Sequence, residues 1–229
     1  MIGWYDWVGG REAVLRFGPA DGPVVAAALP PFEEANRTRT FAVGLLRALG
    51  ERGIVGLLPD LPGTGESLVP LDHATLADWR AAFVAAAAPA RFTIAIRAGV
   101  LIDNQAQVRG RWRLAPQPGE ALVRELIRIR HATLREEGTV FDAAEIEEDG
   151  PAIPIAGNFI GRRMLRDLKA AEPSECGLIR TVRLDSDAQT AHRKVPGAPL
   201  WRRAEPGDER ALSTLLAADI ADWIARCDA

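Results

Sequence analysis

FTIAIRAG, residues 92–99, is a mainly apolar run of strand length that ends in an arginine, an alanine and a glycine. A run of this kind without alternation is typical of a strand that is covered on both faces. Further apolar runs at residues 24–29 and 54–58 have the same character, and two more strands are expected at residues 111–115 and 177–184. Together they predict the central sheet of an α/β protein.

Segments with helical spacing separate these strands. Residues 40–52 carry apolar side chains at a helical interval, and residues 75–88 begin with Thr75 as a predicted N-cap and Asp78 at the third position. A final helix is predicted over residues 207–226. Strands that alternate with helices indicate parallel βαβ units with right-handed crossovers.

The N-terminus adds a different unit. Gly9 and Gly10 separate two short strand-like segments, residues 4–7 and 12–17. A glycine pair readily adopts the positive φ angles of a tight hairpin turn. We therefore expect an antiparallel hairpin at one edge of the mostly parallel sheet.

The middle of the chain changes character. We predict a helix over 120–137, an acidic segment rich in Pro and Gly over 139–157, and another helix over 161–171. Residues 118–174 are therefore expected to form a small helical cap within a single domain, residues 1–229, since this length still suits one core. The arginines on the first helix favour a charged lid, a partner surface or, more commonly, a solvated face: Arg124, Arg128, Arg130 and Arg135.

Bulk composition narrows the function classes. The net charge of −3, with both signs well mixed, argues against nucleic acid or an anionic membrane as partner. Neither a signal peptide nor a run of about 20 apolar residues is present, so we expect a soluble cytoplasmic protein without membrane insertion. Cys176 and Cys227 are expected to be buried or nearly buried thiols. No metal or cofactor is expected, and the loop at Gly63 lacks the lysine of a P-loop.

Three loops follow the carboxyl ends of predicted strands, where open parallel sheets bind ligands. They cover residues 30–36, 59–67 and 96–99. The residues expected to form one ligand-binding cleft are Phe32, Glu33, Glu34, Asn36, Arg97, Ala98 and Trp201.

Five stretches carry a family resemblance. LLPDLPGTGES, residues 57–67, is similar to the segment after the fourth strand of α/β-hydrolases. LPPFEEANRTR, residues 29–39, resembles the HPFAEEMNKSRR loop of the exosortase A system-associated hydrolases, and residues 122–130 and 155–157 are similar to the same branch. GAPLW, residues 197–201, resembles its late GPPFW run. The resemblance implies a three-layer α/β-hydrolase fold, a hydrolase label and a link to exopolysaccharide export and exosortase-dependent sorting.

The position of the nucleophile is occupied by an arginine. Serine hydrolases carry the nucleophile on a sharp G-x-S-x-G turn between strand and helix, and the matching residues here are Ala95-Ile96-Arg97-Ala98-Gly99. A guanidinium is not a nucleophile at neutral pH. The branch often has arginine at this position, so the resemblance implies that Arg97 is inherited.

The other triad roles also lack good candidates. Asp185 or Asp187 is the expected acid, but residues 197–201, where the base should lie, contain no histidine, and His192 comes too early. None of the serines, Ser67, Ser174, Ser186 and Ser213, lies on the elbow. The sequence therefore predicts that nucleophile and base are both missing.

An unpaired charge at the bottom of a cleft is expensive, so we predict an ion pair between Arg97 and Glu33 or Glu34. The pair acts either as a structural clasp or as part of a site for a carboxylate or phosphate. Asn36 is expected to cap its helix, and Asp60 to fix its own loop through backbone N–H groups. Trp79 and Trp201 are expected to pack in the core or under the lid, with Trp201 also in the cleft wall.

Three hypotheses follow from different classes. The first is a non-catalytic protein that binds a small anionic molecule or a partner chain. The second is an ester or thioester hydrolase in which a carboxylate such as Glu34 or Asp60 activates water and Arg97 stabilises the oxyanion. The third is an accessory subunit of a larger assembly, and a homodimer is also compatible with the sequence.

Overall fold

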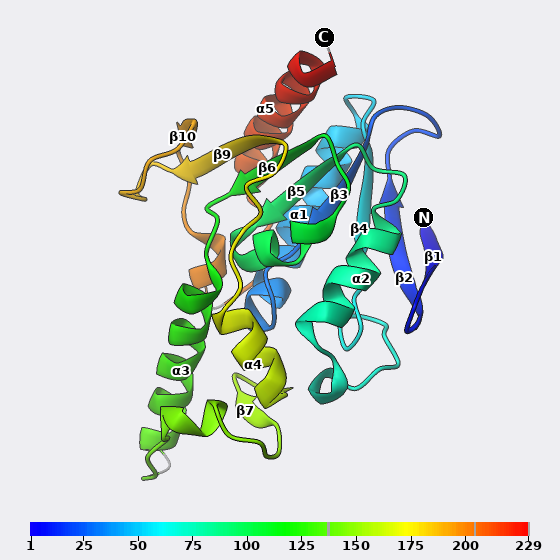
Figure 1. Ribbon diagram of the computed structural model, residues 1–229. Coiled ribbons are helices and arrows are strands. Elements are labelled where there is room, and N and C mark those ends of the chain that lie inside the picture. The colour runs from blue at the N-terminus through cyan, green and yellow to red at the C-terminus, as the bar shows by residue number, and fades with distance from the viewer. Residues whose placement is uncertain (137, 204, 229) are drawn as a thin grey trace.

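The computed structural model describes residues 1–136, 138–203 and 205–228. Its centre is an eight-stranded sheet with the order β1-β2-β4-β3-β5-β6-β9-β10 (Figure 1). The strands are β1 (Ile2–Trp7), β2 (Gly10–Phe17), β3 (Val24–Ala28), β4 (Val55–Pro59), β5 (Phe92–Ile96), β6 (Gly110–Leu114), β9 (Leu178–Leu184) and β10 (Arg193–Val195).

The sheet is parallel from β4 to β10, and only the N-terminal hairpin is antiparallel. β1 pairs with β2, and β2 pairs antiparallel with β4 through Val14 and Pro59. β3 lies between β4 and β5 and is parallel to both. The predicted mixed sheet with an antiparallel edge is confirmed, whereas the short strand β10 was not predicted.

Helices cover both faces of the sheet and create a three-layer arrangement (Figure 1). α1 (Glu33–Gly50) and α5 (Arg210–Asp228) pack together on one face, and α2 (Leu76–Ala86) covers the other. The strand β3 serves both cores, because successive side chains point to opposite faces. Val25 and Ala27 join the α1 and α5 core, while Ala26 and Ala28 join the α2 core.

The beginnings of α1 and α2 show one wrong and one correct prediction. Thr75 and Asp78 form the predicted capping box at the start of α2. α1 begins at Glu33, seven residues before the predicted start, so Asn36 lies inside the helix and the prediction of an Asn36 cap is wrong. Phe32 occupies the N-cap position with φ 58°. The acidic first turn, Glu33 and Glu34, suits the positive end of the helix dipole.

The segment between β6 and β9 contains α3 (Gly119–Glu136), a β7–β8 hairpin (Ile153–Ile155 and Asn158–Ile160) and α4 (Arg162–Lys169). These elements lie together beyond one edge of the sheet, toward the bottom of Figure 1. Their apolar side chains, including Leu122, Leu126, Leu165 and Leu168, belong to the same core as α2. The small β7–β8 hairpin was not predicted.

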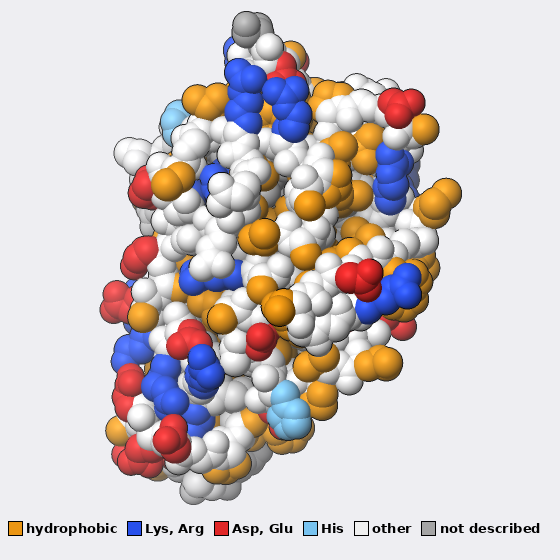
Figure 2. Space-filling view, turned by 45° about the vertical axis from the view of Figure 1, so that its right-hand side comes forward, with side chains coloured by type: hydrophobic (Ala, Val, Ile, Leu, Met, Phe, Trp, Pro, Cys, Tyr) orange, Lys and Arg blue, Asp and Glu red, His pale blue; other side chains and the backbone are white. Residues whose placement is uncertain are grey.

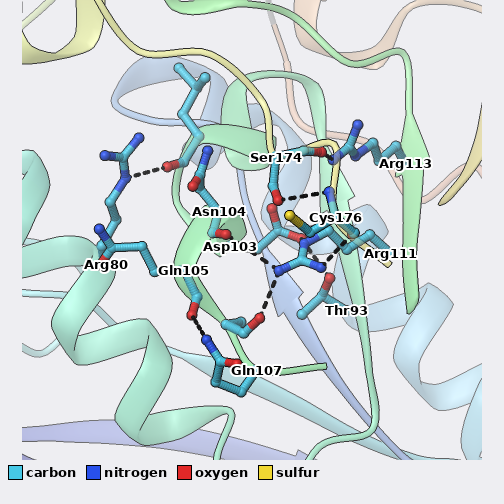
Figure 3. A network of polar contacts seen from close by, with 12 residues as sticks. Arg80, Thr93, Asp103, Asn104, Gln105, Gln107, Arg111, Arg113, Ser174 and Cys176 are labelled. Carbon is cyan, nitrogen blue, oxygen red and sulfur yellow. Dashed lines mark hydrogen bonds and ion pairs between the residues drawn. The ribbon is translucent and has the colours of Figure 1, made fainter. Parts of the chain in front are cut away.

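A buried polar network anchors the chain where it returns from α4 to β9 (Figure 3). Arg111 donates to the Cys176 carbonyl at 2.9 Å, and Arg113 donates to the Ser174 carbonyl. Asp103 is completely buried beside them and accepts from Thr93 Oγ1 at 2.5 Å. The network ties this linker to β6 and to the loop after β5.

The surface agrees with the mixed charge of the sequence. Blue and red side chains are intermingled toward the lower left of the face in Figure 2. Among the described residues, no helix combines the length and the apolar character needed to cross a membrane. Cys227 is buried as predicted, but Cys176 is exposed, because only its backbone takes part in the network around Arg111.

Candidate functional site

The turn that follows β5 has the strained geometry of a nucleophile elbow. Arg97 lies at its crest with φ 53°, in the left-handed region that few non-glycine residues adopt. A Cβ on Gly99 would lie 2.3 Å from the Ala28 carbonyl oxygen, so glycine is required where the turn approaches β3. Ala95, at the position of the first glycine, is fully buried and fits without positive φ.

The Arg97 guanidinium is held by two carboxylates and an aromatic ring. Its Nε and Nη2 each donate to Glu34 at 3.3 Å, and Nη2 also donates to Glu125 at 3.3 Å. The guanidinium carbon lies 5.0 Å from the centroid of the Trp201 ring. Only 14% of the Arg97 side chain is exposed. The predicted ion pair with Glu34 is therefore present, and Glu125 is a partner that the sequence did not indicate.

The topology explains why Glu34 rather than Glu33 reaches Arg97. β3 and β5 are neighbours, so the first turn of α1 lies beside the crest of the turn after β5. Successive helical side chains point in directions about 100° apart. Glu33 consequently faces Arg37 at 2.8 Å, and Arg37 in turn donates to the Trp201 carbonyl at 3.1 Å.

Burial dominates the electrostatics of Glu34. Desolvation raises the pKa of the Glu34 carboxyl above its ordinary value, while the neighbouring Arg97 guanidinium lowers the pKa by a smaller amount. The charge of the Glu34 carboxylate is thus favoured mainly by the Arg97 guanidinium, with a smaller contribution from Arg37.

Asp60 lies in a separate group of polar contacts. It accepts from Arg39 at 3.0 Å and from the backbone N–H of Glu66 at 3.1 Å, so it fixes its own loop as predicted. A Cβ on Gly65 would lie 2.3 Å from the Asp60 carboxyl carbon, so the loop closes tightly around this carboxylate. Asp60 has no hydrogen bond to Arg97 among the described residues.

The residues expected for the acid and base roles are not assembled. Asp185 is exposed, and Asp187 pairs with Arg183 at 2.7 Å. His192 precedes β10 and its Nδ1 accepts from the Thr181 N–H at 3.0 Å. Ser67 donates to Glu12 at 3.0 Å. Within residues 1–136, 138–203 and 205–228, no serine hydroxyl is hydrogen-bonded to a histidine.

No group of three or more His, Cys, Asp or Glu side chains with the spacing for a metal ion is found among the described residues. The carboxylates near the crest, Glu34 and Glu125, instead share the Arg97 guanidinium.

Two separate hollows take the place of the single predicted cleft. The first, here called the basic cleft, has a volume of about 350 Å³ and includes Arg97, Glu125, Arg183 and Trp201 in its lining. The second, here called the apolar cavity, also has about 350 Å³ and is lined by side chains such as Phe32, Trp79 and Phe83.

The predicted cleft residues are divided between these hollows. Arg97 and Trp201 line the basic cleft, whereas Phe32 and Asn36 line the apolar cavity. Ala98 is fully buried and lines neither hollow. Phe32 and Asn36 lie in the apolar cavity because the start of α1 presents them there, and Glu33 and Glu34 line neither hollow.

Sequence reasoning missed several residues of the basic cleft. Arg183 and Arg202 come from β9 and from the loop after β10, and both line this cleft. Arg124 and Arg128, for which the sequence leaves a charged lid, a partner surface or a solvated face open, line it as well. Their spacing of four residues on α3 was the available signal, since residues four apart share one helix face.

Comparison with known proteins addresses the fold. No family model matches the chain, and no curated protein matches it. Among solved structures, Est1E from Butyrivibrio proteoclasticus, bound to ferulic acid, superposes with a TM-score of 0.65 at 14% identity, over 97% of this chain and 98% of that one. Mouse alpha/beta hydrolase domain-containing protein 10 has a TM-score of 0.62 at 14% identity, over 99% of each chain.

A third similar structure is the esterase domain of a Rhodothermus marinus protein, with a TM-score of 0.62 at 14% identity over 99% of this chain and 98% of that chain. Identities this low establish the fold and not the chemistry. The predicted α/β-hydrolase fold is confirmed by these neighbours and by the strand order.

Proposed function

We propose that this α/β-hydrolase-fold protein is a degenerate hydrolase without serine-hydrolase activity, whose cleft beside Arg97 binds a small anionic ligand. The proposal rests on the ion pairs of Arg97 with Glu34 and Glu125 at the crest of the elbow, here called the clasp. The Arg97 guanidinium lies there between Glu34 and Glu125, at 3.3 Å from each. A hydroxyl nucleophile with a histidine base would be needed at this place for acyl transfer.

The clasp also defines the role of Arg97 in this proposal. Its Nη2 is shared by Glu34 and Glu125, and the Trp201 ring covers the guanidinium. Arg97 thus builds the cleft wall, and the ligand is held by other groups of the lining. The fold contributes a rigid scaffold at the carboxyl ends of the strands, where open sheets present their ligand sites.

The experiment is labelling of the native protein with a fluorophosphonate probe, together with turnover of p-nitrophenyl esters. We expect neither labelling nor turnover. An Arg97→Ser variant is the matched test, because it restores a hydroxyl at the crest but supplies no base; we expect it to remain unlabelled. Labelling of the native protein that disappears on heat denaturation would contradict the proposal.

A second candidate function is hydrolysis by a carboxylate, and the raised pKa of the buried Glu34 carboxyl beside Arg97 favours it. In this version Glu34 activates water and Arg97 stabilises the oxyanion, while Asp60 is the less favoured carboxylate because Arg39 occupies it. Ester or thioester turnover that is abolished in Arg97→Ala and Glu34→Ala, but retained in the exposed control Glu120→Ala, would establish it. Turnover retained in both site variants would end it.

The finer assignment to the exosortase A system-associated branch is proposed on four sequence stretches, of which residues 29–39 are the most specific. With it we propose a cytoplasmic accessory role and residues 118–174 as the cap of one domain. Exposed Ile2, Trp4 and Val8 on the edge hairpin support a homodimer. Light scattering coupled to size exclusion, with and without lysate, tests for a dimer or a larger complex, and cell fractionation tests the location.

A further inference from the structure

We propose that the basic cleft is a site for a small molecule with a multiply charged oxyanion, such as a phosphate ester, held by Arg124, Arg128 and Arg202. This inference deepens the proposed function and rests on its claim that the cleft binds an anion. These three arginines are not part of the ion pairs that hold Arg97.

The lining of the basic cleft has an excess of positive charge. The cleft lining contains five arginines and two carboxylates, although the whole chain has a net charge of −3. Arg97 is paired with Glu34 and Glu125, and Arg183 with Asp187. With Glu34 included, the group still has an excess of two positive charges. An excess of this kind concentrates anions at the cleft.

Three of these arginines form no ion pair or hydrogen bond through their guanidinium groups within the described residues. Within residues 1–136, 138–203 and 205–228, no carboxylate lies within 4.0 Å of Arg124, Arg128 or Arg202. Their guanidinium groups also form no hydrogen bond to a protein acceptor in this part of the chain. These three guanidinium groups therefore keep their planar donor pairs available for a ligand.

The three arginines come from two elements that both line the cleft. Arg124 and Arg128 lie one turn apart on α3, so they share a helix face. Arg202 comes from the short 3-10 helix Leu200–Arg202, which follows β10. Two elements that border the cleft thus supply guanidinium groups to the same lining. The volume of about 350 Å³ suits a small molecule.

Arg183 adds a buried donor to the lining. Its side chain is 9% exposed, and its Nε is buried without a hydrogen-bond partner, while Nη1 and Nη2 are occupied by Asp187 and the Pro116 carbonyl. Arg183 is therefore held in the lining by Asp187 and the Pro116 carbonyl, and the ligand is assigned to the three arginines without such partners.

The positive excess of the cleft favours a ligand with more than one negative charge. A monocarboxylate brings one negative charge, which leaves part of the positive excess uncompensated. A phosphate ester brings nearly two charges and three acceptor oxygens at neutral pH. Three guanidinium forks from two elements of the lining fit an anion with several oxygens better than a single carboxylate. We therefore expect affinity to rise with the charge of the anion.

The experiment is isothermal titration calorimetry at low ionic strength with inorganic pyrophosphate, inorganic phosphate and acetate. For the wild-type protein we expect pyrophosphate to bind most tightly and acetate at least about ten-fold more weakly, since one lost charge-assisted contact of about 1.4 kcal/mol is a factor of ten. The Arg124→Ala/Arg128→Ala variant should lose at least about ten-fold in pyrophosphate affinity.

The matched control is Arg135→Ala/Arg226→Ala, which removes the same charge from exposed positions outside the cleft lining and should bind as the wild type does. Arg202→Ala tests the second element of the lining, the 3-10 helix Leu200–Arg202, and should also weaken pyrophosphate binding. Equal losses in the control and the cleft variants, equal affinity for acetate, or no binding by the folded wild type would overturn the inference. Ester turnover by a protein that still binds pyrophosphate in the cleft would overturn only the absence of catalysis.

Discussion

A left-handed backbone and a permanent charge coincide at Arg97. The φ of 53° costs of the order of 1 kcal/mol or more for a residue with a Cβ. The side chain offsets this cost through two carboxylates and contact with the Trp201 ring. The strained turn is therefore retained together with a clasp that depends on arginine.

Removing Arg97 leaves two carboxylates close together and without their cation. We expect Arg97→Ala to lower the free energy of unfolding by about 2 kcal/mol at pH 8. Without the guanidinium the pKa of Glu34 rises further, so protonation relieves the repulsion at low pH and the loss should be smaller at pH 5. Chemical denaturation at both pH values measures this.

A double-mutant cycle provides the control for that prediction. Arg97→Ala/Glu34→Ala should cost less than the sum of the two single variants, because Arg97→Ala leaves Glu34 and Glu125 without their shared cation and the second change removes one of these carboxylates. Additive losses would show that Arg97 and Glu34 are not coupled, which contradicts the clasp.

The buried Asp103 carboxyl should make the free energy of unfolding depend on pH. Burial raises the pKa of Asp103 from 3.8 to about 6. Between these values the folded state binds a proton that the unfolded state lacks, so stability falls as the pH rises through this window, by about 3 kcal/mol. Asp103→Asn should remove this slope from the pH profile of unfolding, and parallel profiles for variant and wild type would contradict it.

Among the elements, α1 determines how the two hollows are separated. Its early start places Glu34 at the crest of the elbow and Asn36 in the lining of the apolar cavity. The apolar pattern of residues 40–52 predicted only the part of α1 that packs on the sheet. Its first turn is polar, so periodicity gave no signal there, and the double proline before it obscured the start.

The contact between β3 and the turn after β5 depends on one glycine. We expect Gly99→Ala to lower the free energy of unfolding by about 2 kcal/mol or more, since the added Cβ would lie 2.3 Å from the Ala28 carbonyl oxygen. Gly44→Ala in α1 is the matched control, because the nearest atom, Ser213 Oγ, is 3.8 Å away. There the change should stabilise by up to about 1 kcal/mol. Equal effects would contradict the close-approach argument.

On the scale of the whole molecule, Asp219 joins four elements of the sheet and its cover. This carboxylate of α5 accepts from Trp112 on β6 at 2.9 Å, from Arg180 on β9 at 2.6 and 2.8 Å, and from Arg193 on β10 at 2.7 Å. The hydrogen bonds from Arg180, Trp112 and Arg193 outweigh desolvation and hold the pKa of Asp219 well below its ordinary value.

Asp219→Asn should therefore cost about 3 kcal/mol at pH 7, where the wild type gains from the charged carboxylate. A depressed pKa contributes stability above the unfolded value of 3.8 and loses it as the pH falls, so the difference should shrink toward pH 3. Urea unfolding at pH 7 and pH 3 measures it. Asp222→Asn, at an exposed position of the same helix, is the control and should have little effect.

The α/β-hydrolase fold followed from local sequence. Strands such as residues 92–96 are apolar on both faces, and Thr75 with Asp78 satisfies its own helix end, so short-range physics determined these elements. Arginine at the crest was likewise visible in the sequence, because the elbow is a contiguous motif.

The partners of Arg97 and the gathering of arginines were decided only by the tertiary structure. Glu34 is 63 residues from Arg97 in the chain. Arg37, which donates to the Trp201 carbonyl at the same site, is 164 residues from Trp201. Whether Glu33 or Glu34 turns toward the crest depends on where α1 begins, and the basic cleft needs α3, β9 and the loop after β10 in one place. Charges pair by distance in space, and sequence spacing reports such distances only within a single helix or turn.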